Sequence, residues 1–525
     1  MNISNLLFPN RTSNFGKDPV FDITSVYAAL LRSRNSAARP DHLPGRFFRV
    51  LAAELAPSLL IIFQQSFLSG RIPDMWRIAL VRPIFKKGLR EIAANYRPVS
   101  LTCVASKIME SIVRDAMYSH LKDNNLLNNA QHGFRERRST VSSLLLSYHH
   151  YIENIENKSD IDILFFDFAK AFDAVNHDLL LLKLNAYGFS KYLLSWIANF
   201  LMDRKQFVCI GTKVSNVKPV QSGVIQGSII GVLLFLLFIN DLPDVVRTSN
   251  VLLYADDLKL FKVIKSLLDR LALQTDIDRI LDWSIAWCLP LSFDKLVYLH
   301  LGLRFPDYVY NCGLHAIKQM SSVKDLGVVF CNNVNFRNHY ESMCKKANSL
   351  CALIFRSFES RDPSFLISLF NVYVKPVLEY SSCVWSPHLK KDIDMIERVQ
   401  RKFTKRIPTL HNLSYNDRLA YLNIQSLEHR RLYIDIVTLY KIVHGFINVN
   451  IHDFGISPVT QHSLRKYGLG LKVVKPLTSL RMFSFANRSC KLWNLLPKNI
   501  VLLSIGKFKN YVHNCDLVKL YHTGH

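Results

Sequence analysis

Apolar positions recur with helical spacing from Leu51 to Leu68, and Gly70 and Pro73 mark the end of this predicted helix. The next segment, RIALVRPIFKKG, predicts a strand that runs into a basic turn. The segment NYRPVSLTCVASKIMESIVRDAMYSHL then predicts a short extended stretch and a helix, separated by Pro98. The start of the chain therefore mixes helices with strands.

A strand buried on both faces is predicted from Ile161 to Phe166. Its residues are large and apolar apart from Asp162, and the run ends on Asp167. Helical spacing follows between Leu179 and Leu201. The carboxylate of Asp167 is thus expected at the end of a buried strand.

A hairpin is predicted where the strands Val251 to Ala255 and Leu258 to Val263 flank Asp256 and Asp257 at two-residue spacing. Both acids would share one tight turn. For any one of these aspartates, capping of a backbone amide is the simpler interpretation. Carboxylates held together on rigid backbone would instead suit divalent cations and phosphoryl transfer to a nucleotide.

From about residue 335 the spacing becomes mostly helical, which predicts a separate helical bundle. Its predicted helices are Arg337 to Phe358, Ser364 to Val377, Asp392 to Ile407 and Glu428 to His444. The residues after 450 mix short apolar runs with turn residues and suggest no chemistry.

The charge balance points to a polyanionic partner. Lysine and arginine outnumber aspartate and glutamate by 66 to 41, which gives a net charge of +25 and a pI of about 9.6. Nucleic acid is the first candidate. An anionic membrane surface is the alternative, but the basic residues are spread along the chain and form no single block.

Neither secretion nor a membrane span is expected. The N-terminus lacks a charged stretch followed by an apolar core, and the most apolar run, Gly223 to Ile239, is interrupted by Gln226 and Ser228. The ten cysteines lack the close spacing of zinc sites and are expected to be reduced core thiols. The protein is therefore expected inside the cell, in the nucleus or the cytoplasm.

Seven sequence blocks follow one another across residues 40 to 330. They are NYRPVSL (Asn95 to Leu101), QHGFRERRST (Gln131 to Thr140), FFDFAKAFDAVNH (Phe165 to His177), SGVIQGSIIGVLLFLLFINDL (Ser222 to Leu242), LLYADDLKLF (Leu252 to Phe261), LSFDKLVYLHLG and VKDLGVVF. In kind and order, these blocks strongly resemble the motifs of reverse transcriptases from non-long-terminal-repeat retrotransposons, the jockey-like group.

The resemblance implies an α+β right-hand polymerase fold, with fingers and palm in residues 41–334 and a helical thumb-like domain in residues 335–450. Residues 1–40 would be a loosely ordered leader, and residues 451–525 a C-terminal extension. The thumb-like region is also similar to the family in VKPVLEYSSCVWSPHL, IERVQRKFTKRI and RRLYIDIVTLYKIVHG. The implied activity is RNA-directed DNA polymerase, with an RNA template, a DNA primer and deoxynucleoside triphosphates as partners.

The family pattern assigns the metal ligands to Asp167, Asp256 and Asp257, which would hold two Mg²⁺ ions, or Mn²⁺ in their place. Lys295 matches a late-palm lysine that would protonate the departing pyrophosphate. Without the resemblance, a solvated surface lysine is an equally good interpretation of Lys295.

The resemblance also implies the nucleotide-binding residues. Arg97 would clamp the incoming triphosphate with its fork of donors, helped by the lysines of the preceding basic turn. Phe172 would crowd the sugar 2′-position and select deoxynucleotides, although core packing is the simpler interpretation of a lone phenylalanine. Gln226 and Gly227 match the nucleotide-binding turn, where glycine permits close backbone approach.

One helix of the thumb-like region would present four basic residues on one face, as needed to follow a nucleic-acid backbone. A plain solvated face is the alternative. These residues are Arg398, Arg401, Lys402 and Lys405. Four other positions depart from the family pattern without removing a metal ligand: Ile225, Val232, Ser292 and Leu296.

Nothing in this sequence resembles the endonuclease that usually precedes the polymerase in such elements. The chain is therefore expected to polymerise without cutting DNA, as a truncated copy of an element. Two alternatives remain: a catalytically silent copy that only binds RNA, and an intron-type maturase. The match of the thumb-like region to retrotransposons disfavours the maturase.

Overall fold

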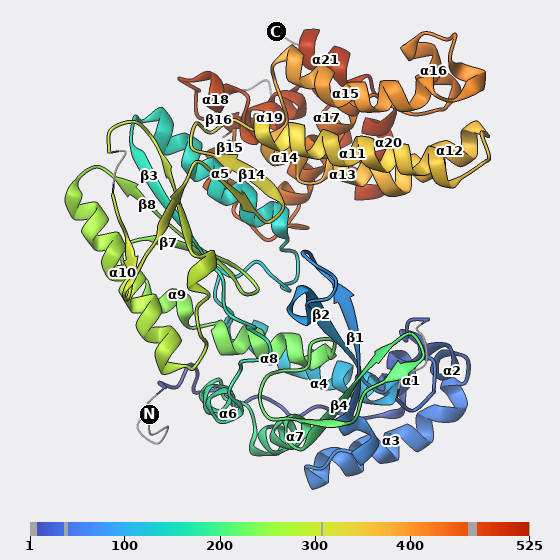
Figure 1. Cartoon of the computed structure of the whole chain (residues 1–525), viewed down its shortest axis with the longest axis vertical. Coiled ribbons are helices and arrows are strands. Elements are labelled where there is room, and N and C mark those ends of the chain that lie inside the picture. Colours follow the sequence, from blue (N-terminus) through green and yellow to red (C-terminus); the bar gives the residue numbers. More distant parts are fainter. Residues whose placement is uncertain (1–7, 36–39, 306–307, 460–469, 524–525) are drawn as a thin grey trace.

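The computed structural model describes residues 8–35, 40–305, 308–459 and 470–523. Figure 1 shows three parts: a helical lobe from the C-terminal segments at the top, a sheet with the long helix α10 at the left, and a second α/β part at the bottom, built from several blue to green segments of the first half of the chain. The two α/β parts together confirm the predicted mixture of helices and strands.

Helices and strands alternate up to residue 331, and helices dominate afterwards. The helices of the first stretch are α1 (Ile23–Leu31), α2 (Gly45–Val50), α3 (Ala52–Ser69), α4 (Val104–Asp123), α5 (Thr140–Glu156), α6 (His177–Ala186), α7 (Lys191–Leu201), α8 (Ile229–Ile239), α9 (Leu242–Val245) and α10 (Leu267–Ala286). Those of the second are α11 (Arg337–Ser357), α12 (Pro363–Leu369), α13 (Lys375–Glu379), α14 (Ser382–Trp385), α15 (Lys390–Lys405), α16 (Tyr415–Tyr421), α17 (Leu427–Val443), α18 (Ser479–Met482), α19 (Phe485–Leu495), α20 (Ile505–Asn514) and α21 (Leu517–Thr523).

Within the described residues, the strands form two larger sheets and three short pairs. They are β1 (Ile78–Phe85), β2 (Tyr96–Leu101), β3 (Asp160–Phe166), β4 (Arg204–Ile210), β5 (Lys213–Val214), β6 (Lys218–Val220), β7 (Asn250–Tyr254), β8 (Asp257–Ile264), β9 (Val297–Leu301), β10 (Asn311–Cys312), β11 (His315–Ala316), β12 (Lys318–Met320), β13 (Ser322–Asp325), β14 (Val328–Cys331), β15 (Ile456–Pro458) and β16 (Leu471–Val473).

The sheet of the bottom part in Figure 1, the lower sheet, has the strand order β2-β1-β4-β5, with β6 also paired to β4. Strands β1 and β2 are antiparallel, and their register places Pro98 opposite Pro83. The prediction that Pro98 separates the extended stretch from the helix is therefore wrong, because β2 continues to Leu101 and α4 begins at Val104. Proline suits extended backbone, and two facing prolines leave no N–H without an acceptor.

The sheet beside α10 in Figure 1, the central sheet, has the strand order β12-β9-β3-β8-β7. Successive side chains of β3 point to opposite faces of the sheet. Ile161 and Ile163 therefore point into a core that also includes residues of α5 and of the helical lobe. Leu164 and Phe166 enter the other core, which α8 and α10 help to form. The predicted burial of this strand on both faces is confirmed.

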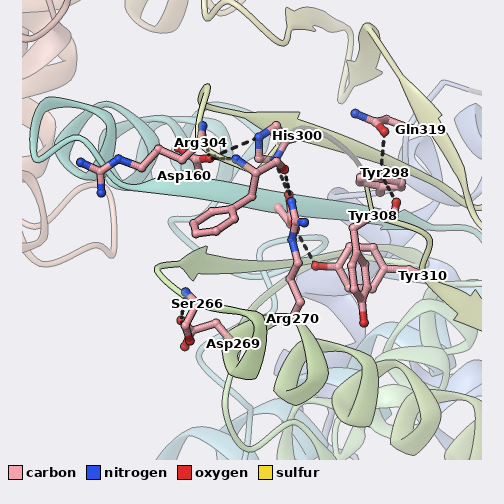
Figure 2. A network of polar contacts seen from close by, with 12 residues as sticks. Asp160, Ser266, Asp269, Arg270, Tyr298, His300, Arg304, Tyr308, Tyr310 and Gln319 are labelled. Carbon is pink, nitrogen blue, oxygen red and sulfur yellow. Dashed lines mark hydrogen bonds and ion pairs between the residues drawn. The ribbon is translucent and has the colours of Figure 1, made fainter.

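The one charged residue inside the predicted run, Asp162, is fully buried and satisfied by polar partners. Figure 2 labels these partners, Arg270, His300 and Tyr310. His300 Nδ1 lies 2.6 Å from its Oδ1, the Tyr310 hydroxyl donates to its Oδ2 at 2.5 Å, and Arg270 Nε lies 3.3 Å from the same oxygen. Asp160 accepts two backbone N–H groups from the loop after β9. Buried charges need such partners, and these tie α10 and that loop to the buried strand.

The helical lobe contains the predicted helices, with one difference. The segment predicted as one helix from Ser364 to Val377 consists of α12, a π-helical stretch Phe370–Val374 and α13. Pro376 is the second residue of α13, just after the π-helical stretch, and its ring nitrogen cannot donate an α-helical hydrogen bond. The predicted helices at α11, α15 and α17 are confirmed.

Eight of the ten cysteines are buried free thiols, whereas Cys288 is exposed and Cys515 is partly buried. Across the described ranges, no helix is both long enough and apolar enough to cross a bilayer.

Candidate active site

Asp167 stands at the end of the central sheet, immediately after β3. The register of β3 and β8 pairs Phe166 with Leu258, which brings Asp167 beside the first residue of β8. The backbone carbonyl of Asp167 accepts a hydrogen bond from Ser292 N–H at 2.8 Å. The predicted strand-end position is confirmed, and the backbone there is held from both sides.

The predicted hairpin is formed by β7 and β8, and Tyr254 pairs with Asp257 at its end. The turn therefore consists of Ala255 and Asp256, and Ala255 adopts left-handed backbone with φ of 57°. Asp257 is the first residue of β8, so the prediction that both acids lie on the turn is wrong by one position. The two carboxylates still follow one another next to Asp167.

The pKa values in the site show that these carboxylates repel one another electrostatically. Burial against the protein, followed by the charges of Asp256 and Asp167, raises the pKa of Asp257 to about 6. Burial and then Asp167 also raise the pKa of Asp256, while Arg97 and Lys86 lower it. Asp257 keeps contact with solvent on a pocket wall. A cation bound there would therefore relieve repulsion that the protein itself creates.

Lys295 contacts the first of the predicted metal ligands. Its Nζ lies 3.0 Å from both carboxylate oxygens of Asp167, and half of its side chain is exposed. Asp167, Asp257 and Lys295 line one pocket of about 190 Å³. Lys295 thus shares this pocket with two of the three predicted metal ligands, whereas Asp256 does not line it.

The predicted triphosphate clamp comes from the lower sheet. Arg97 lies on β2 opposite Ile84, near the end of β1, and Lys86 and Lys87 follow β1 directly. All three cations are exposed. Arg97 and Lys86 act on the pKa of Asp256, so their positive charge reaches the acidic turn.

Phe172 lies in the turn that follows Asp167 and stacks on Phe235 of α8, with ring centroids 4.3 Å apart. Its carbonyl accepts the N–H of Val224 at 2.8 Å. Gly223 takes φ of 89°, and a Cβ there would lie 2.6 Å from Asp173 Cα. The half-buried ring is therefore held by the loop before α8 and by α8 itself.

Gln226 and Gly227 place this same loop against β2. The carbonyl of Gln226 accepts the N–H of Ser100 at 2.8 Å. Gly227 has φ of 124°, and a Cβ there would lie 2.4 Å from the Ser100 carbonyl oxygen. As predicted, position 227 requires glycine because another backbone segment comes very close. That segment is β2, the strand that carries Arg97.

Two residues that sequence reasoning did not single out hold the acidic turn in place. The buried Gln131 side chain accepts the Ala255 N–H at 2.9 Å and donates to the Ala255 carbonyl at 3.2 Å. Gly133 packs so closely that a Cβ would lie 2.2 Å from Ala255 N and 2.9 Å from Tyr254 C. Both residues lie in the block QHGFRERRST. The resemblance of this block to the family was the one feature of the sequence that could have pointed to them.

The four predicted basic residues of α15 are all exposed, opposite a buried face that includes Ile396, Val399 and Phe403. They share one face, as predicted. Figure 1 shows α15 along the side of the helical lobe that is remote from β1 and β2. The structure therefore does not bring these cations to the three aspartates.

In the described residues, no group of three or more histidine, cysteine, aspartate or glutamate side chains is gathered closely enough to hold a metal ion. The chemistry of the aspartates still suits a hard divalent cation, because they offer carboxylate oxygens whose charges repel one another. The ion pair of Asp167 with Lys295 occupies one of these carboxylates. A cation would have to take the place of the lysine ammonium.

Residues 84–330 match the family model described as reverse transcriptase (RNA-dependent DNA polymerase). The chain carries a reverse transcriptase domain. The RNA-directed DNA polymerase from mobile element jockey of Drosophila melanogaster is 27% identical over 382 residues, which are 70% of this chain and 41% of the relative. The probable RNA-directed DNA polymerase from transposon X-element of the same species is 25% identical over 403 residues, 74% of this chain and 44% of the relative.

A third relative is the retrovirus-related Pol polyprotein from type-1 retrotransposable element R1 of Bradysia coprophila. It is 26% identical over 313 residues, which are 57% of this chain and 30% of the relative. The predicted resemblance of the reverse transcriptase domain to jockey-like elements is confirmed. The chain spans less than half the length of these relatives.

Proposed function

We propose that the reverse transcriptase domain is an RNA-directed DNA polymerase of retrotransposon origin, which adds deoxynucleotides to a primer 3′-hydroxyl. The observation that carries the proposal is the position of Asp167, Asp256 and Asp257 at one end of the central sheet, where burial and the neighbouring carboxylates raise the pKa values of Asp256 and Asp257. An RNA template, a DNA primer and deoxynucleoside triphosphates are its partners inside the cell. The net charge of +25 suits these polyanions.

Two divalent cations, Mg²⁺ or Mn²⁺, would activate the primer hydroxyl and neutralise the triphosphate in this reaction. Asp167 and Asp256 would hold them, with Asp257 contributing less directly. Lys295, which now pairs with Asp167, would be released when a cation binds. Its ammonium group would then hold a proton for the departing pyrophosphate.

The proposed hand-like layout assigns fingers and palm to residues 41–334 and a thumb to residues 335–450. The lower sheet would be the fingers, because it carries Arg97 and Lys86, and the central sheet would be the palm. Residues 1–40 would then be a leader and residues 451–525 an extension. The basic face of α15 would contact nucleic acid outside the pocket that Asp167 and Asp257 line.

Phe172 is proposed to discriminate against ribonucleotides. Its ring is fixed by the stack on Phe235, and it lies in the turn that follows Asp167. Phe172→Ala is expected to raise incorporation of ribonucleotides relative to deoxynucleotides by roughly 10- to 200-fold, the range that one pocket contact supplies. The measurement is the ratio of kcat/KM for the two nucleotides.

Phe235→Leu is the matched control for this variant. It removes the same ring stack but leaves the Phe172 side chain in the turn that follows Asp167, so most of the discrimination should remain. Equal discrimination in the parent and in Phe172→Ala would rule out this role for Phe172.

Primer extension on an RNA template tests the proposed function. A polymerase extends the primer in the presence of Mg²⁺, whereas a silent RNA-binding copy retains the template without extending the primer. Binding of the primer–template should be measured on the same sample, so that an inactive protein is distinguished from one that does not bind.

A further inference from the structure

The helical lobe contains a cavity of about 270 Å³ that the proposed polymerase chemistry does not use. Its wall is formed by the segment between α14 and α15 and by α15, α17, α19 and α21, which Figure 1 shows near the C-terminal end of the chain. Its polar and aromatic lining includes His388, Glu428, Arg431, Phe483, Lys491 and Tyr521. The cavity therefore combines cations and one carboxylate with aromatic surface.

Arg431 of α17 is the unusual member of this lining. Only 2% of the residue is exposed, yet neither Nη1 nor Nη2 has a hydrogen-bond partner in the described part of the chain. Burial lowers the pKa of this guanidinium. Nearby Glu397, Glu428 and Asp435 favour its charge electrostatically, but within the described residues its two terminal nitrogens lack hydrogen-bond acceptors as the site stands.

The carboxylates around this guanidinium are engaged elsewhere. Glu397 accepts two backbone N–H groups at the start of α17. Asp435 pairs with Arg488, whose Nε lies 3.0 Å from its Oδ2, and Glu428 pairs with His522 at 3.0 Å. The acceptor that Arg431 lacks therefore has to come from outside this set.

Further groups on the wall suit an anion with several oxygens. Lys491 supplies a second cation, whose Nζ lies 4.8 Å from the centroid of the Tyr521 ring. His388 stacks on Phe483 with ring centroids 4.2 Å apart and planes at 4°, which makes one side of the cavity rigid. The two cations thus come from different elements, α17 and α19, whereas a carboxylate is bound by the two parallel donors of one guanidinium.

We propose that this cavity binds a phosphate group, with Arg431 as its principal donor and Lys491 as a second cation. The volume is ample, because a phosphate occupies only a few times the ~30 Å³ of a water molecule. A neighbouring cavity of about 550 Å³ shares Ser386, His388 and Phe483 with the first and leaves room for the rest of a phosphorylated molecule. The proposal does not depend on polymerase activity.

Thermal unfolding with inorganic phosphate as the probe tests this site. Phosphate should raise the Tm of the parent chain above its value in sodium chloride of equal ionic strength, because a ligand that binds only the folded state stabilises it. Arg431→Met should lose that difference. Its own Tm in chloride should be close to that of the parent, because burial already disfavours the Arg431 charge and the variant breaks no hydrogen bond of Nη1 or Nη2 within the described chain.

Phosphate also stabilises proteins non-specifically, so the comparison between variants decides the outcome. Lys390→Met is the matched control: Lys390 is on α15, 80% of its side chain is exposed, and its loss should leave the phosphate effect unchanged. Lys491→Met should reduce the effect. An equal phosphate-induced rise in the parent and in Arg431→Met would overturn the proposal.

Two further probes identify the source of the phosphate. A 5′-phosphorylated oligonucleotide that binds the parent more tightly than its 5′-hydroxyl counterpart, with the advantage lost in Arg431→Met, would identify a nucleic-acid end. A nucleoside monophosphate whose affinity falls about tenfold or more in Arg431→Met would identify a free nucleotide. If Arg431→Met changes binding of none of the three probes, the cavity is not a phosphate site.

Discussion

Asp256→Asn is expected to lower templated nucleotide addition by about a thousandfold, which corresponds to several kcal/mol of lost transition-state stabilisation. Asparagine keeps the size of the side chain but removes the negative charge that would hold a cation beside the primer hydroxyl. Asp256 is the second residue of the β7–β8 turn, and Asp167 contributes to its raised pKa. Single-turnover primer extension on an RNA template measures this loss.

The folded state should not suffer from this substitution. A raised pKa means that the ionised form of Asp256 is disfavoured in the folded protein, so the neutral amide should leave Tm unchanged or raise it. Asp294→Asn is the matched control, since Asp294 is an exposed carboxylate next to Lys295 and outside the proposed metal ligands. Equal rates for Asp256→Asn and the control would remove Asp256 from the proposed mechanism.

Gly133→Ala is expected to lower the rate of nucleotide addition by about a hundredfold, because displacing catalytic groups by about 1 Å has an effect of that order. The new Cβ would lie 2.2 Å from Ala255 N, and the obstructing atoms are backbone. The acidic turn would have to move, and the two hydrogen bonds of Gln131 to Ala255 would be disturbed. The aspartates themselves would be unchanged.

Primer-extension rates and Tm should be measured together for this variant. Gly506→Ala is the matched control, since a Cβ at Gly506 in α20 meets nothing within 4 Å and should leave the rate unaffected. A parent-like rate in Gly133→Ala would contradict the role given to the packing of Gly133 on the turn.

The elements that follow from local spacing were predictable from the sequence. The helix ending at Gly70 is α3, where this glycine adopts left-handed backbone with φ of 65°. The buried strand before Asp167 and the hairpin around Asp256 also depend on neighbouring residues alone. The exact turn was not predictable, because the left-handed backbone of Ala255 is held by the distant Gln131.

Interactions across long stretches of chain were the part that the sequence did not reveal. Asp162 looked like an exception in an apolar strand, because its partners His300 and Tyr310 lie 138 and 148 residues away. The ion pair between Lys295 and Asp167 joins residues 128 apart. Arg431 lies within the helix predicted from Glu428 to His444, and only the packing of several helices shows that it is buried with no hydrogen bond at Nη1 or Nη2 among the described residues.

Extension of a DNA primer annealed to an RNA template, with deoxynucleoside triphosphates and Mg²⁺, tests the central claim most directly. The proposed function predicts a product complementary to the template that requires the divalent cation and is lost in Asp256→Asn. A protein that binds the primer–template but leaves the primer unextended in both Mg²⁺ and Mn²⁺ would contradict it.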